Sequence, residues 1–185
     1  MYMRIAVDID EVLVPHLFPL AKFHNKQLPV DRKYPYLFRD VFNCSEADSQ
    51  KMIREFYHSK DFLELQPIND SQYALWQIAR ENNKVYAVTG RQQYVRTQTE
   101  NWLNEHFPGV FHDLVMTNSF TPREVPKSTV CRSLGIHVIV DDNYEICKDC
   151  FKHNIDVINF IGDPVYPWCE ENEISIKSWD ELIVR

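Results

Sequence analysis

Short apolar runs recur along the chain with the length of buried strands. They cover residues 4–9, 84–89, 113–118, 137–142 and 156–161. A strand that is covered on both faces of its sheet shows a nearly continuous apolar run instead of strict alternation. The pattern therefore predicts five strands of a parallel sheet.

Amphipathic stretches separate these runs and predict helices, at residues 70–82, 93–107, 127–135 and 144–154. In the first stretch Leu75, Ile78 and Ala79 share one face, and Gly135 fits a C-cap at the end of the third. The alternation of strand and helix predicts an α/β fold, a Rossmann-like three-layer core with helices on both faces of a parallel sheet. Residues 178–182, SWDEL, predict a short final helix.

The interval between the first strand and the first of these helices is too long for an unstructured loop. Within it, residues 45–60 favour a helix, because Ser45 can cap its start and Ile53, Phe56 and Tyr57 fall on one face. We therefore expect a small helical cap inserted after the first strand. The expected organisation is a cap at 16–65 within a catalytic core formed by 1–15 and 66–185.

Charge and cysteine usage narrow the class of protein. The chain has 20 Lys and Arg against 27 Asp and Glu, and a net charge of −7 disfavours binding to the phosphate backbone of nucleic acid. No apolar run approaches the roughly 20 residues of a membrane span, and acids lie where a signal peptide needs apolar residues. Five scattered cysteines argue against a disulfide framework. We expect a soluble, cytoplasmic protein without a membrane partner; the pattern carries no indication of oligomeric state.

Polar residues with the chemistry of phosphoryl transfer follow four of the predicted strands or the helix after them. The set is Asp8 and Asp10, Thr89, Lys127, and Asp141 with Asp142. Ligands of a parallel sheet bind outside the carboxyl ends of its strands, where these residues would meet. Asp8 is the candidate nucleophile, because a carboxylate can hold a phosphoryl group as an acyl phosphate. Asp10, with Ile9 turned into the core between them, is the candidate general acid and base.

A phosphate beside several carboxylates requires a hard cation, and Mg²⁺ prefers oxygen ligands. Asp8, Asp10 and Asp142, with Asp141 beside them, are the candidate metal ligands. Thr89 and Lys127 offer fixed donors to the transferred oxygens, and backbone N–H groups near Glu11, Val12 and Gly90 would complete the cradle. Each piece alone has an ordinary explanation as a turn, a cap or a solvated side chain. Their placement at one edge of one sheet favours the catalytic interpretation.

With these residues in place, the chain resembles the haloacid-dehalogenase-like (HAD) phosphohydrolases, whose four motifs match VDIDEVL, VYAVTGR, VPKS and VIVDD. The resemblance implies a Rossmann-like core, a Mg²⁺ ion and a phospho-aspartate at Asp8. The cap insertion is similar to that of the 5′(3′)-deoxyribonucleotidases. Glu11 departs from this subgroup, which usually carries Gly there, so we expect a stiffer loop and an extra carboxylate near the phosphate.

The implied function is magnesium-dependent hydrolysis of a small phosphorylated metabolite, such as a (deoxy)nucleoside monophosphate. Two alternatives remain open: a phosphatase acting on nucleic-acid ends, and a catalytically degenerate module that binds a phospho-ligand or a protein.

Weaker signals concern substrate binding. Arg91 follows Thr89 and Gly90 and could clamp a second anionic group, or be a surface residue. His16 and Phe18 follow the first motif and could form a pocket wall, although such aromatics more often belong to the interior of a cap. Cys147, Cys150 and His153 recur at three-residue spacing, but a buried thiol face explains them better than zinc, because a fourth ligand is missing.

Overall fold

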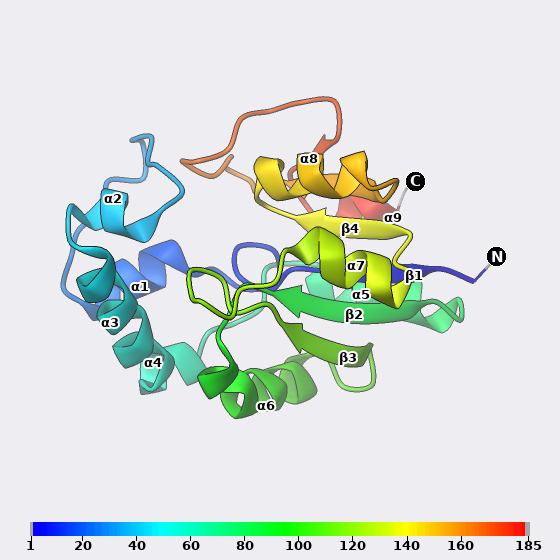
Figure 1. Cartoon of the computed structure of the whole chain (residues 1–185), viewed down its shortest axis with the longest axis horizontal. Coiled ribbons are helices and arrows are strands. Elements are labelled where there is room, and N and C mark those ends of the chain that lie inside the picture. The colour runs from blue at the N-terminus through cyan, green and yellow to red at the C-terminus, as the bar shows by residue number, and fades with distance from the viewer. Residues whose placement is uncertain (1, 184–185) are drawn as a thin grey trace.

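The computed structural model describes residues 2–183, which form one sheet flanked by helices (Figure 1). The strands are β1 (Arg4–Val7), β2 (Lys84–Thr89), β3 (Phe111–Met116), β4 (Val138–Asp141), β5 (Asp156–Phe160) and β6 (Ser175–Ile176). They lie in the order β3-β2-β1-β4-β5-β6, and every pair is parallel. The predicted α/β fold with a parallel sheet is confirmed, and β6 is a short addition that the apolar pattern did not indicate.

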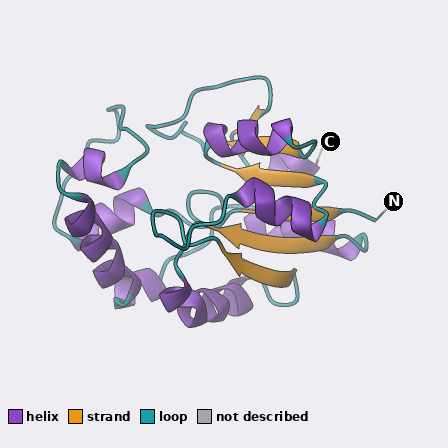
Figure 2. Ribbon diagram, in the orientation of Figure 1, coloured by secondary structure: helices purple, strands orange, loops and turns teal. Residues whose placement is uncertain are grey.

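Helices cover both faces of this sheet (Figure 2). Those of the core are α5 (Ser71–Arg80), α6 (Arg96–His106), α7 (Lys127–Leu134), α8 (Tyr144–Lys152) and α9 (Asp180–Ile183), and a 3₁₀ turn, η1 (Gln93–Val95), precedes α6. Gly135 ends α7 in the left-handed conformation with φ +62°, as its position predicted.

Alternation along the strands divides the apolar residues between the two faces. Ile5 and Val7 of β1 belong to a large cluster that includes Leu75 of α5, whereas Ala6 belongs to a smaller cluster with Cys131 of α7 and Cys150 of α8. Two buried layers on opposite faces make this a three-layer core.

Four helices of the inserted region gather beyond the carboxyl ends of the strands (Figure 1). They are α1 (Leu17–Phe23), α2 (Phe38–Phe42), α3 (Glu46–Tyr57) and α4 (Lys60–Leu63). Ser45 caps α3 by accepting the Asp48 N–H, as expected. We call residues 16–65 the cap; this division of the chain stays a prediction.

The cap is packed against the core through apolar residues. Ile53, Phe56 and Tyr57 of α3 are buried in the same cluster as Ile5 and Val7 of β1. The cap and the large face of the sheet therefore share one hydrophobic interior. Among the described residues, no helix combines the length and apolar character needed to cross a membrane.

The turn after β1 positions the start of the cap. Glu11 has φ +63°, a conformation that favours Gly. Its carboxylate Oε1 accepts the backbone N–H groups of His16 (2.9 Å) and Leu17 (2.6 Å) at the start of α1. We expected an extra carboxylate beside the phosphate. The structure shows how this carboxylate is held: it accepts from otherwise unpaired donors at the N-terminus of α1, and Glu11 also lines the cavity described below, so its place near the phosphate stays a prediction.

This geometry predicts different costs for two substitutions of Glu11. Glu11→Ala and Glu11→Gly both remove the carboxylate that accepts the N–H groups at the start of α1. Loss of these hydrogen bonds should lower the free energy of unfolding by about 1 kcal/mol in each variant. Glu and Ala both carry a Cβ at φ +63°, whereas Gly does not, so Glu11→Gly should regain about 1 kcal/mol and be more stable than Glu11→Ala by that amount. Urea unfolding followed by circular dichroism measures both; an Ala variant as stable as the Gly variant would contradict the assigned strain.

Candidate active site

The candidate site lies where the strand order reverses. β1 pairs with β2 on one side and with β4 on the other, and the chain continues outward in both directions. In open parallel sheets this switch point leaves a crevice at the carboxyl ends of the strands. Asp8 directly follows β1 and Asp141 is the last residue of β4. The sheet thus brings the first and fourth sequence motifs together.

Lys127 joins these two carboxylates. Its ammonium Nζ lies 2.9 Å from Asp8 Oδ2 and 2.7 Å from Asp141 Oδ2, and all three side chains are buried. Lys127 is the first residue of α7, which packs beside β2 and α8. The two carboxylates raise the pKa of Lys127 well above its usual value, against the opposing effect of burial. The ammonium is therefore a fixed positive charge beside Asp8.

Asp142 completes a group of three acids. Ligand atoms of Asp8, Asp141 and Asp142 all lie within 4.8 Å of one another. Trp168 Nε1–H donates to Asp142 Oδ2 at 2.8 Å, and the Asn143 N–H donates to Asp141 Oδ1 at 3.0 Å. These neutral donors orient the carboxylates without neutralising their charge.

The three acids are in an electrostatically unfavourable arrangement that a cation would relieve. Burial, opposed by Lys127 and reinforced by Asp141, raises the pKa of Asp8 to about 7. Burial and the neighbouring carboxylates also raise the pKa of Asp142 well above its usual value. Hard carboxylate oxygens at this spacing fit Mg²⁺, which takes oxygen ligands and retains waters. The donor set therefore suits the ion expected from the sequence.

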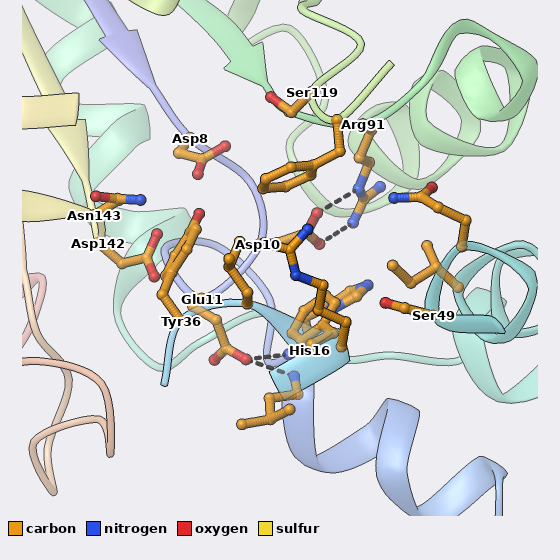
Figure 3. Close-up of a pocket in the computed structure, with 18 of the residues that line it drawn as sticks. Asp8, Asp10, Glu11, His16, Tyr36, Ser49, Arg91, Ser119, Asp142 and Asn143 are labelled. Carbon is orange, nitrogen blue, oxygen red and sulfur yellow. Dashed lines mark hydrogen bonds and ion pairs between the residues drawn. The ribbon is translucent and has the colours of Figure 1, made fainter. Parts of the chain in front are cut away.

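Asp10 lies apart from this group. Its carboxylate forms a two-pronged ion pair with Arg91, with Nη2 to Oδ1 at 2.6 Å and Nε to Oδ2 at 3.0 Å (Figure 3). Burial alone would raise the pKa of Asp10, but the Arg91 guanidinium holds it below its usual value. The structure does not bring the Asp10 side chain into the candidate metal group, and it keeps this carboxyl ionised.

Arg91 lies in the wall of the candidate site and pairs there with groups of the protein itself. Besides Asp10, it donates through Nη1 to Thr99 Oγ1, and its guanidinium lies 4.9 Å from the ring centroid of Phe62. Its side chain is 1% exposed. The alternative of a surface residue is therefore wrong, the observed partner of Arg91 is Asp10, and the role of a substrate clamp stays a prediction.

Thr89 is the last residue of β2, and Gly90 follows it. Thr89 is fully buried, its Oγ1 accepts the Arg91 N–H at 3.2 Å, and it is not among the residues that line the cavity described below. Gly90 lines the cavity, and a Cβ there would lie only 3.0 Å from Ser119 Oγ. Ser119 lines the same wall and was not expected from the sequence. The small residue permits this close approach of two chain segments.

A cavity of about 380 Å³ opens between the cap and the sheet. Asp8, Asp10, Lys127 and Asp142 line it from the core, and His16 lines it from the cap side (Figure 3). Further cap side chains complete the wall, among them Tyr36, Phe38, Ser49, Ile53 and Tyr57. A concave pocket that combines apolar and aromatic side chains with convergent charged groups is the usual form of a small-molecule site.

His16 is a buried polar residue in the wall of this cavity. It is 2% exposed, and neither ring nitrogen has a hydrogen-bond partner among the described residues. Its ring is stacked on Phe38, with centroids 5.3 Å apart. Burial lowers the pKa of His16, so the neutral ring is favoured. A neutral imidazole offers one donor and one acceptor to a bound molecule.

Other residues singled out in the sequence lie elsewhere. Phe18 in α1 is half-buried and is not among the residues that line the cavity. Cys147 and Cys150 are fully buried on the inner face of α8, whereas the His153 ring contacts the Asp149 carbonyl near the surface. The expected thiol face is thus observed.

A comparison with known protein families identifies the family of this chain. Residues 2–121 match the model of the family described as 5′ nucleotidase, deoxy (pyrimidine), cytosolic type C protein (NT5C). A search of the curated proteins finds no match.

Solved structures with the same fold cover nearly the whole chain. A protein described as a predicted phosphatase from Clostridium acetobutylicum is 15% identical with a TM-score of 0.71, over 98% of this chain and 96% of that one. A haloacid-dehalogenase-like hydrolase from Streptococcus pneumoniae is 12% identical with a TM-score of 0.71, over 99% and 97%. The HAD-hydrolase YfnB from Bacillus subtilis, bound to magnesium, is 15% identical with a TM-score of 0.64, over 99% and 97%.

At these identities the structures establish the fold, and the family match, which spans more than half of the sequence, establishes the family. The chain belongs to the family of 5′ nucleotidase, deoxy (pyrimidine), cytosolic type C proteins and is a HAD-like phosphatase.

Proposed function

We propose that this phosphatase is a magnesium-dependent phosphomonoester hydrolase that forms an aspartyl-phosphate on Asp8, with a (deoxy)nucleoside monophosphate as substrate. The observation that carries the proposal is the buried Lys127 ammonium between Asp8 and Asp141, with Asp142 beside them on the cavity wall. This arrangement supplies a nucleophile, a fixed cation and a metal-ligating group within one pocket.

In the proposed first step, an Asp8 carboxylate oxygen attacks phosphorus while the bond from phosphorus to the leaving oxygen breaks. The product is an acyl phosphate on Asp8, and the leaving oxygen takes a proton from Asp10. Water then attacks the same phosphorus, its proton passes to Asp10, and inorganic phosphate leaves with Asp8 restored. Lys127 stabilises the charge on the transferred oxygens throughout.

Arg91 sets the protonation state in which Asp10 begins. Ion pairing at 2.6 Å favours the carboxylate, which is the form that accepts a proton from water in the second step. Donation to the leaving oxygen requires the protonated form, so the pair with Arg91 must weaken and Asp10 must take up one proton from solvent before the first step. We propose that binding of the substrate phosphate near Asp10 provides this weakening through repulsion between the two negative charges.

Asp8, Asp141 and Asp142 would hold the Mg²⁺ ion. When bound, the ion offsets the repulsion between substrate phosphate and carboxylates and polarises the phosphoryl group.

The cavity lining supports a substrate with one phosphate and a flat ring. Among the described residues the lining cations Arg39, Arg91 and Lys127 are each paired with an acid, at 3.0, 2.6 and 2.9 Å, so a second phosphate would have to compete with a carboxylate. Stacked rings of His16 and Phe38 offer an apolar face, and the unpartnered nitrogens of His16 offer hydrogen bonds. A nucleobase combines both properties.

Asp8→Asn should reduce release of phosphate from a nucleoside monophosphate by at least about 10³-fold, because the amide is a poor nucleophile. Its melting temperature should not fall. In this variant the Lys127 ammonium still pairs with Asp141. The variant also no longer buries the Asp8 carboxylate, whose pKa is raised by that burial. Asp31→Asn, at an exposed position, is the matched control. Persistent turnover by the Asp8 variant would eliminate this nucleophile.

Removal of divalent cations with EDTA should abolish turnover, and Mg²⁺ should restore it. Mg²⁺ should also raise the melting temperature, because an ion present at about 100 times its Kd stabilises the folded state by about 2.7 kcal/mol. Asp142→Asn should lose most of this thermal shift. Equal rates with EDTA and with Mg²⁺ would exclude a metal-dependent reaction.

His16→Leu tests the substrate class. Loss of a hydrogen bond to the base should lower kcat/KM for nucleoside monophosphates about tenfold. The value for glycerol phosphate, which has no base, should stay within about twofold. A 5′-phosphorylated oligonucleotide should be a poor substrate because the cavity is small and its cations are paired. Equal losses on the nucleotide and on glycerol phosphate would contradict base recognition by His16.

A further inference from the structure

Residues 167–169, which we call the bridging segment, contact Asp142 with two side chains. Trp168 Nε1–H donates to Asp142 Oδ2 at 2.8 Å, and Cys169 Sγ lies 3.5 Å from the Asp142 carbonyl oxygen. The segment belongs to the Pro-rich stretch after β5, which sequence patterns left unassigned. It therefore holds both the side chain and the backbone of one acid of the candidate metal group.

The same segment contacts the cap with its backbone. The Pro167 carbonyl accepts the Tyr34 N–H at 3.2 Å, and the Cys169 carbonyl accepts from Lys33 Nζ at 2.8 Å. Three consecutive residues thus touch Asp142 on one side and the loop before α2 on the other. The bridging segment therefore connects the cap loop at Lys33 and Tyr34 directly to the acidic group.

The indole of Trp168 is held in place by its own packing. It is stacked on Tyr166 with ring centroids 5.1 Å apart and an interplanar angle of 17°. The Tyr166 ring in turn lies against Gly162, where a Cβ would approach the ring to 2.5 Å. A donor fixed in this way can set the orientation of the carboxylate that it contacts.

Orientation matters for Asp142 because little else restrains its carboxylate. The side chain is 3% exposed and lies among like charges, whereas Asp8 and Asp141 are both tied to Lys127. Trp168 Nε1–H is the one hydrogen-bond donor to the Asp142 carboxylate among the described residues. Without this donor the carboxylate would be free to turn away from the position that a cation requires.

We propose that Trp168 is a positioning residue that orients Asp142 for binding of a divalent cation. We also propose that the bridging segment couples the cap loop at Lys33 and Tyr34 to this binding. The inference rests on the proposed function, in which Asp142 is a ligand of Mg²⁺. Because coupling is reciprocal, occupancy by the cation should also steady the cap loop at Lys33 and Tyr34.

Isothermal titration calorimetry of Mg²⁺ into the substrate-free protein tests the first part. Trp168→Phe removes the N–H donor and keeps an aromatic ring, so the Kd for Mg²⁺ should rise about tenfold, as for other residues that orient metal ligands. Trp76→Phe changes an exposed tryptophan of α5 and should leave the Kd unchanged. A Kd of Trp168→Phe within about twofold of the wild type would overturn the inference and leave the proposed function intact.

Failure of the wild-type protein to bind Mg²⁺ would overturn the proposed function, and the inference with it. Circular dichroism and melting curves without Mg²⁺ establish whether Trp168→Phe folds.

The coupling is tested by a variant that touches neither Trp168 nor Asp142. Lys33→Met removes the contact with the Cys169 carbonyl and should raise the Kd for Mg²⁺ about fivefold. Lys51→Met removes the same charge from an exposed site on α3 and is the matched control. Equal Kd values for the two variants would overturn the coupling. In the wild type, Mg²⁺ should slow hydrogen exchange of the Tyr34 amide, and this effect should be lost in Trp168→Phe.

Discussion

The buried ammonium of Lys127 is the interaction on which the site depends. Asp8 and Asp141 come from different strands and would repel one another in an interior that screens charge poorly. Lys127 lies within 2.9 Å of both and makes their proximity tolerable. Its placement at the start of α7 is therefore a condition for closing β1 against β4 with acids at both strand ends. One cation partly balances three carboxylates, and the remaining negative charge is what a bound divalent ion would offset.

The fold was largely predictable because buried parallel strands leave a strong signal in the order of residues. The runs at residues 4–9 and 84–89 contain β1 and β2, and the stretch at 127–135 matches α7 with its terminal Gly135. The two-residue strand β6 and the four- to seven-residue helices α1, α2 and α4 escaped prediction. Elements of that length contain too few positions for a periodicity, and tertiary packing decides their conformation.

The sequence predicted most residues of the site, but it did not predict their hydrogen-bond and ion-pair partners. Strand ends identified Asp8, Lys127 and Asp141, and the topology brings them together. The contacts of Arg91 and Glu11 could not be predicted, because each depends on the direction that a long side chain takes in the folded protein. Arg91 pairs with Asp10 and faces the interior, and Glu11 caps α1 while its backbone keeps a conformation typical of Gly. Trp168 lies in an irregular loop far along the chain, where neither periodicity nor spacing indicates a contact with Asp142.

The hydrophobic interior that joins the cap to the sheet has a kinetic consequence. A cap that only rested on the sheet through polar contacts would open at little cost, and access to the cavity would be nearly free. Here Phe56 and Tyr57 are buried in the same cluster as the strands, so any widening of the entrance exposes apolar surface to water. Entry of the phosphate ester and departure of the product are then activated events. The rate at which this interior opens then sets an upper limit on the exchange of any molecule too large for the closed entrance.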